Sequence, residues 1–294
     1  MFVFKRLGRH WVKIGTASPQ RSRAVFMRGG GKMDLSEVLN GYYQSHDEDS
    51  RLRSRHGCVE FLTTVRYIDK YLRPGMKILD IGAGTGIYSH HYARQGYEVD
   101  AVELIEHNIE KFRANTQPGE RVTIWQGNAV SLDFIMSESY DVTLLLGPMY
   151  HLMDEKSKHA AMDEAFRVTK RGGVMFVSYF MSDPSIIGYC FLKGNLKKVL
   201  DAGLIDPKTF LTTSTPAEVF ELYRREEIDA LAARLDVKRL HFVGTDMYTN
   251  YFKEYIDSLD DGTFEWYLKY HFNICERPDM TGISHHTLDI LKKR

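Results

Sequence analysis

Three glycines at alternate positions form the most informative pattern in the sequence. They lie in Lys77-Ile-Leu-Asp-Ile-Gly-Ala-Gly-Thr-Gly-Ile-Tyr88, directly after a short apolar run. Glycine lets the chain turn sharply and lets a ligand approach bare backbone, while the start of a following helix presents free N–H groups to an anion. The third glycine of a dinucleotide fingerprint would fall at position 87, which is Ile. The spacing therefore disfavours a nicotinamide dinucleotide.

The spacing Gly82-x-Gly84-x-Gly86 is typical instead of S-adenosylmethionine sites. That ligand brings an amino-acid carboxylate and ammonium to the turn rather than a pyrophosphate. Asp80, at the end of the apolar run, can accept a hydrogen bond from the ammonium group. We assign Ala83, inside the turn, to the same site.

Two later segments supply groups for the rest of such a ligand. Glu103 ends the next apolar run 21 residues after Gly82, close to the spacing of about 20 expected for a carboxylate that binds ribose hydroxyls. We assign Leu104 to the same site. Asn128 and Ala129 follow the third apolar run, where a side-chain oxygen and a backbone N–H could bind adenine.

A fourth turn, Gly147-Pro-Met-Tyr-His-Leu152, follows an apolar run that ends near Leu146. Ligands of open α/β sheets lie beyond the carboxyl ends of the strands, so this turn should face the reacting group. We assign Leu146 to the cofactor site. Tyr150 and His151 are the nearest groups that can handle a proton, and His151 is the candidate general base because histidine titrates near neutral pH.

Helix and strand patterns alternate around these motifs, which predicts an α/β fold with a mostly parallel sheet and crossover helices. Expected strands are 76–81, 97–102, 122–125, 140–146, 174–180, 239–243 and 287–291. Expected helices are 59–72, 87–95, 106–115, 155–169, 186–200, 217–235, 251–258 and 264–275.

Five regions follow from these patterns. Residues 1–32 are basic and contain no Asp or Glu, and we expect a disordered leader or non-native extension with Met33 as the natural start. Residues 33–72 are expected to form a helical lid, in which Tyr43 and Arg53 contact the substrate. The cofactor-binding core spans 73–181, a helical cap spans 182–236, and 237–294 complete the sheet.

Composition narrows the function further. The 294 residues carry 39 basic and 39 acidic side chains, so nothing indicates the basic excess of a nucleic-acid binder. No apolar run approaches the length needed to span a bilayer. Three scattered cysteines fit a reducing compartment, so we expect a cytoplasmic protein. The pairs His90-His91 and His285-His286 point in different directions on regular elements, and we predict no metal site.

These motifs, in this order, resemble the class I S-adenosylmethionine-dependent methyltransferases. The resemblance covers roughly residues 40–180. Within that class, 147–152 and Glu48-Asp-Ser-Arg-Leu52 are similar to small-molecule enzymes described as ubiquinone-biosynthesis methyltransferase-like. The resemblance implies a Rossmann-like doubly wound sheet of seven strands, with 239–243 and 287–291 as the last two. It also implies that Asn128 stands where the family usually has Asp.

By this resemblance, Asp80 and the three glycines hold the methionine part, Glu103 the ribose, and Asn128 with Ala129 the adenine. We expect methyl transfer from S-adenosylmethionine to a small-molecule acceptor. Alternatives are a methyltransferase acting on nucleic acid or protein, a nicotinamide oxidoreductase, and a non-catalytic cofactor sensor.

Overall fold

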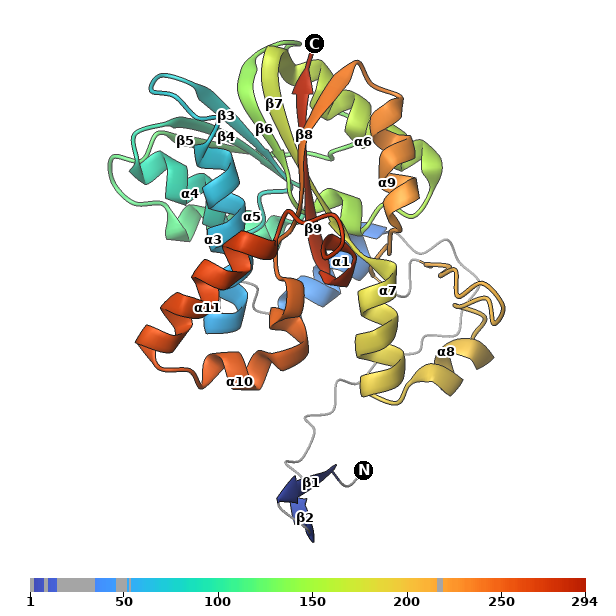
Figure 1. Cartoon of the computed structure of the whole chain (residues 1–294). Helices are drawn as coiled ribbons and strands as arrows, with labels where there is room; N and C mark the ends of the chain where they lie inside the picture. Colours follow the sequence, from blue (N-terminus) through green and yellow to red (C-terminus); the bar gives the residue numbers. More distant parts are fainter. Residues whose placement is uncertain (1–2, 8–9, 15–34, 46–51, 53, 216–218) are drawn as a thin grey trace. The chain divides into compact units, whose positions relative to one another are not determined.

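The structure, a computed structural model, describes residues 3–7, 10–14, 35–45, 52, 54–215 and 219–294 (Figure 1). The chain divides into two compact units, Met1–Lys32 and Met33–Arg294. In the first unit, β1 (Val3–Leu7) pairs antiparallel with β2 (His10–Ile14). Both runs contain β-branched and aromatic residues, which favour strands.

One twisted sheet forms the centre of the second unit. Its described residues give seven strands in the order β5-β4-β3-β6-β7-β9-β8. Strands β3 to β7 run parallel, and β9 is antiparallel to both of its neighbours. The predicted Rossmann-like, mostly parallel sheet of seven strands is confirmed. The strands are β3 (Lys77–Ile81), β4 (Glu98–Glu103), β5 (Val122–Gln126), β6 (Tyr140–Leu145), β7 (Thr169–Phe180), β8 (Val237–Gly244) and β9 (His286–Lys293).

Helices cover both faces of this sheet, as Figure 1 shows. On one face, α3, α4 and α11 pack against the side chains of Ile78, Val142 and Phe176, and on the other face α6 and α9 pack against Leu79 and Leu145. The helices are α1 (Leu35–Ser45), α3 (Arg55–Asp69), α4 (Ile87–Arg94), α5 (Glu106–Asn115), α6 (Glu155–Val168), α7 (Ser182–Ser185), α8 (Leu196–Asp201), α9 (Arg225–Ala233), α10 (Lys253–Asp257) and α11 (Asp261–Ile274). Shorter 3-10 or π-helical segments are η1 (Pro148–Tyr150), η2 (Ile186–Leu192), η4 (Met247–Phe252) and η5 (Thr281–Ile283).

The cap region departs from the sequence prediction in two places. The helix expected over 186–200 is broken between η2 and α8, where Gly194 has a positive φ of 72°. The helix expected over 217–235 begins only at Arg225, and residues 216–218 lie outside the described residues. Tyr223 instead donates its backbone N–H to the carbonyl of Phe180 at 2.8 Å. This pairing beside β7 overrides the local preference for helix.

The carboxyl ends of the parallel strands meet the start of β9 at one edge of the sheet. Phe180 ends β7 opposite His286, and Ile81 ends β3 beside Leu145. Strand order reverses between β3 and β6, which is the position where open α/β sheets bind ligands. None of the helices in the described parts of the chain has the length and apolar character needed to span a bilayer. The three cysteines are free thiols, as their spacing predicts.

Candidate active site

The glycine turn after β3 contains two glycines required by packing and one that borders open space. Gly82, Gly84 and Gly86 all have positive φ angles of 74°, 56° and 92°. A Cβ on Gly82 would lie 2.5 Å from Cδ of Pro148, and one on Gly86 would lie 2.6 Å from the rings of His90 and Phe112. A Cβ on Gly84 would meet no described atom within 4 Å. A ligand can therefore approach the backbone at Gly84.

Asp80 lies beneath this turn and is buried. Its Oδ2 accepts a hydrogen bond from Oγ of Ser89 at 2.6 Å. Burial raises the pKa of Asp80 to about 6, although the Ser89 hydrogen bond opposes that shift. A cationic group placed beside Asp80 would favour the ionised carboxylate.

Glu103, at the end of β4, connects the glycine turn to helix α5. Its Oε2 accepts from the backbone N–H of Gly84 and its Oε1 from that of Ile105, both at 2.8 Å. The side chain is buried, which raises its pKa despite those bonds. Sequence spacing predicted a ribose contact here but not this structural role. Of the neighbouring assigned residues, Ala83 is buried against Phe112, and the carbonyl of half-buried Leu104 accepts from Gln126.

Asn128 is exposed after β5. Its side-chain oxygen accepts from the backbone N–H of Val130 at 3.2 Å, a local turn that competes with the predicted contact to adenine. Ala129 is buried in the core, so only its backbone is suited to bind a ligand. Leu146 is half-buried and packs against the core on the other face of the sheet.

His151 is buried at the end of the turn after β6 and has partners on both ring nitrogens. Nδ1 lies 2.8 Å from the carbonyl oxygen of Val219, and Nε2 lies 2.9 Å from the hydroxyl of Tyr43. A carbonyl only accepts, so Nδ1 carries the proton, and Nε2 then accepts from Tyr43. Val219 has a φ of 69°, an uncommon conformation for a β-branched residue. The structure thus directs the lone pair of Nε2 toward helix α1.

Aromatic rings surround Tyr150 and His151. The Tyr150 ring lies 5.8 Å from that of His286 and 6.3 Å from that of Phe180, and the His151 ring lies 5.5 Å from Phe220. Tyr43, predicted as a lid residue, is brought to His151 by α1. Arg53, the other predicted lid residue, lies outside the described residues.

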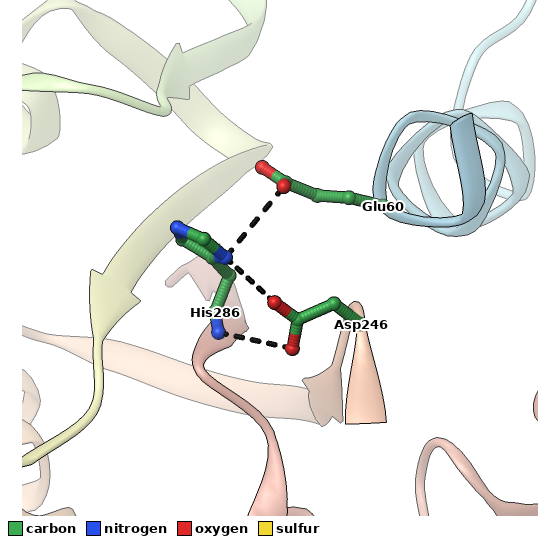
Figure 2. Close-up of side chains that lie close together, drawn as sticks. All are labelled: Glu60, Asp246 and His286. Atoms are coloured by element: carbon green, nitrogen blue, oxygen red, sulfur yellow. Dashed lines mark hydrogen bonds and ion pairs between the residues drawn. The ribbon is translucent and has the colours of Figure 1, made fainter. Parts of the chain in front are cut away.

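Sequence reasoning missed a polar cluster of Glu60, Asp246 and His286, shown in Figure 2. Nδ1 of His286 lies 2.7 Å from Oδ2 of Asp246 and 3.6 Å from Oε2 of Glu60, and ligand atoms of all three lie within 4.8 Å of one another. That spacing is compatible with a bound cation. Asp246 also accepts from Ser284 at 2.6 Å and from the side chain of Asn250. The expected strands 239–243 and 287–291 were the sequence signal that could have revealed this cluster. Their pairing, as β8 with β9, brings residue 246 beside residue 286.

A cavity of about 870 Å³ lies beside this cluster, between the cap and the segment that enters α10. Most of its wall is apolar, and Phe180, Phe220 and His285 belong to it. Phe220 also contacts the ring of His151, so the cavity adjoins the proposed base. Tyr189 lines the cavity, whereas Tyr223 is buried in the core, where its hydroxyl donates to the carbonyl of Met149.

Comparisons with known proteins agree with this geometry. Residues 78–173 match the sequence family described as a methyltransferase domain. Ubiquinone biosynthesis O-methyltransferase from Hahella chejuensis is 26% identical over 78% of this chain and 97% of its own length. The enzyme of that name from Psychrobacter cryohalolentis is also 26% identical, over 57% of this chain, and the chain spans only 63% of that relative's length.

One solved structure shows the same fold. A Thermotoga maritima protein, titled an S-adenosylmethionine-dependent methyltransferase and possible histamine N-methyltransferase, superposes with a TM-score of 0.54. The match covers 89% of this chain and all of that one, at 17% identity.

Proposed function

The chain belongs to the class I S-adenosylmethionine-dependent methyltransferases, and on that premise we propose that it methylates a small-molecule acceptor held in the cavity beside His151. S-adenosylmethionine is the methyl donor of that family. The observation that carries the proposal is that the glycine turn and the cavity lie at the same edge of the sheet. The relatives named as O-methyltransferases favour a hydroxyl acceptor.

The residues around the turn fit the donor. Gly84 offers bare backbone beside open space, and Asp80 is a buried carboxylate suited to the ammonium group. Glu103 already accepts two backbone hydrogen bonds, but a carboxylate has further lone pairs that can accept from ribose hydroxyls. The backbone at Ala129 is proposed to bind adenine, and the side chain of Asn128 is proposed to make a weaker contact with it. Ala83, Leu104, Leu146 and the remaining glycines shape the same site.

His151 is proposed as the general base. Bound S-adenosylmethionine supplies an electrophilic methyl carbon attached to a sulfonium sulfur. As the oxygen of a hydroxyl acceptor bonds to that carbon, the carbon–sulfur bond would break and S-adenosylhomocysteine would leave, while Nε2 of His151 would take the hydroxyl proton. The carbonyl of Val219 stabilises the imidazolium by accepting from Nδ1–H. Tyr43 would move aside for the acceptor or pass the proton on, and Tyr150 would form a wall of the acceptor site.

We also propose the regional assignments. Residues 33–72 act as a lid, 73–181 hold the cofactor, 182–236 form the cap, and 237–294 complete the sheet. The free cysteines support a cytoplasmic location. Equal numbers of basic and acidic residues support a small-molecule acceptor over nucleic acid.

Ligand-dependent thermal unfolding of the full chain tests the cofactor. S-adenosylmethionine and S-adenosylhomocysteine should raise the Tm, and NAD should not, because a ligand that binds the folded state stabilises it by mass action. Glu103→Gln should reduce the shift, whereas Glu110→Ala, an exposed change on the neighbouring helix, should keep it. Formation of S-adenosylhomocysteine with a panel of phenols and amines then tests transfer. A Tm raised by NAD alone would refute the proposal.

A further inference from the structure

His285 is a buried histidine in the wall of the cavity, and Nδ1 of its ring has no hydrogen-bond partner among the described residues. Its exposed fraction is only 9%. Burial lowers the pKa of His285 to about 4, so the ring is neutral near pH 7. A buried polar group left without a partner costs free energy, which calls for an explanation at this position.

The surroundings of His285 hold the ring in place through apolar contacts. Its centroid lies 4.8 Å from that of Tyr251 and 6.4 Å from that of Phe180. A Cβ on Gly188 would lie 3.2 Å from Nε2, so the glycine lets segment η2 approach the imidazole closely. The ring is therefore packed on its sides, and its Nδ1, which is shielded from solvent, has no partner among the described residues.

His271 provides a contrast within the same protein. It is also buried, and burial lowers its pKa to about 4 as well. Its Nδ1 also has no hydrogen-bond partner among the described residues, but its Nε2 bonds to Oγ1 of Thr63 at 2.8 Å, and the ring does not line the cavity. The two rings therefore differ in their surroundings: His271 is held by Thr63, whereas His285 lies against a cavity of about 870 Å³.

We infer that His285 hydrogen-bonds the methyl acceptor within the cavity and selects an apolar molecule that carries a neutral hydroxyl or similar polar group. A neutral imidazole has one N–H and one lone pair, so it can bond a hydroxyl as donor or acceptor. Buried side chains such as Ile186, Val199 and Ile205 supply the apolar wall. Charged cavity residues, Lys193 and Glu254 among them, are exposed. The interior therefore suits an uncharged ligand.

This inference rests on the proposed function for its ligand, but a binding experiment can test it separately. The probes are 2-naphthol and naphthalene, which share a ring system and differ by one hydroxyl. Each is titrated into the full chain at pH 7 with saturating S-adenosylhomocysteine. Wild type should bind 2-naphthol about 10-fold more tightly than naphthalene, because a site built to hydrogen-bond a hydroxyl discriminates against its absence.

His285→Leu should abolish that difference, and the matched change His271→Leu should keep it. His285→Gln, which retains a donor and an acceptor, should restore part of the preference if the Leu variant fails to fold. In ¹⁵N-labelled wild type, 2-naphthol should also shift the imidazole signals of His285. Equal affinities for both probes in wild type, an unchanged preference in His285→Leu, or unshifted His285 signals would each overturn the inference.

Repeating the titration without S-adenosylhomocysteine separates the two proposals. A 2-naphthol preference that depends on His285, in a protein that binds neither adenosyl compound, would support the cavity site and refute the proposed function. Binding of both adenosyl compounds with no such preference would refute the role of His285 alone.

Discussion

The hydroxyl of Tyr43 lies 2.9 Å from Nε2 of His151, although 108 residues separate them in the chain. The opposite ring nitrogen of His151 is held by the carbonyl of Val219 at 2.8 Å. Helix α1 thus places a hydrogen-bond donor on the one ring atom that can accept a proton. Access of an acceptor to that atom requires Tyr43 to take part or to yield.

Replacement of His151 tests whether this nitrogen is the base. His151→Asn should lower kcat by about 10²- to 10⁴-fold, the usual contribution of a general base, and leave the Kd for S-adenosylmethionine unchanged. Tyr43→Phe should lower the free energy of unfolding by about 1 kcal/mol, since it removes one hydrogen bond, and change the KM for the acceptor rather than cofactor affinity. Steady-state kinetics and calorimetric titration measure both. Full activity in His151→Asn would exclude the base role.

The glycine turn allows two chemically identical changes to be compared. Gly86→Ala places a methyl group 2.6 Å from His90 and Phe112 and should lower the free energy of unfolding by about 2–4 kcal/mol. Gly84→Ala adds only the left-handed strain of about 1–2 kcal/mol, but its methyl group occupies the open space beside the turn. It should therefore fold and lose at least about 10-fold in affinity for S-adenosylhomocysteine, the equivalent of about 1.4 kcal/mol.

Denaturant unfolding and calorimetric titration of both glycine variants decide the point. If Gly84→Ala binds S-adenosylhomocysteine as tightly as wild type, the ligand does not lie where we propose.

Asp80 links cofactor binding to pH. Burial raises its pKa from an ordinary 3.8 to about 6, so the folded state binds the proton more tightly than the unfolded state. Stability should therefore fall as pH rises through that window and stay lower above it. Asp80→Asn cannot ionise and should raise the free energy of unfolding at pH 7.5 by at most about 3 kcal/mol.

The same substitution should weaken binding of S-adenosylmethionine, because the ammonium group loses its anionic partner. Wild-type affinity should increase between pH 5 and 7 as Asp80 ionises. Urea unfolding and calorimetric titration at pH 5 and 7.5 measure the two effects. A variant less stable than wild type at pH 7.5 would show that Asp80 is ionised and stabilising without the cofactor.

The local sequence pattern was sufficient to predict the cofactor-binding half of the fold. Apolar runs separated by glycines predicted strands β3 and β4 and helices α4 and α5. The observed bounds lie within one residue of those expected. The position of the turn follows because only glycine readily adopts the positive φ found there.

Contacts between distant segments were not predictable in this way. The carbonyl of Val219 bonds His151 across 68 residues, and the irregular backbone that presents it was expected to be helix. Asp246 meets His286 across 40 residues, through the pairing of β8 with β9. Periodicity describes one segment at a time and does not say which side chains two strands bring together. The sequence therefore predicted Tyr43, Tyr150 and His151 for the acceptor side, whereas the contacts of Val219 with His151 and of Asp246 with His286 came only from the structure.

The Asp246–His286 pair gives the last prediction. Burial raises the pKa of Asp246, but the charge and hydrogen bond of His286 outweigh that effect, and the pKa is lowered. The stability this contributes is present above the ordinary value of 3.8 and is lost as pH falls toward the lowered one. Asp246→Asn should therefore lower the free energy of unfolding at pH 7 by about 3 kcal/mol, with a smaller difference below pH 4.

Hydrogen bonds account for this cluster, so a chelator should leave the Tm unchanged. Glu60 lies 3.6 Å from Nδ1 of His286, close enough for the three side chains to share a cation. Unfolding is measured with EDTA, Mg²⁺, Mn²⁺ or Zn²⁺, with Glu110→Gln as an exposed control for Glu60→Gln. A Tm raised by several degrees by one cation, in wild type and Glu110→Gln but not in Glu60→Gln, would contradict the hydrogen-bond account. It would also show that the sequence prediction of no metal site was wrong.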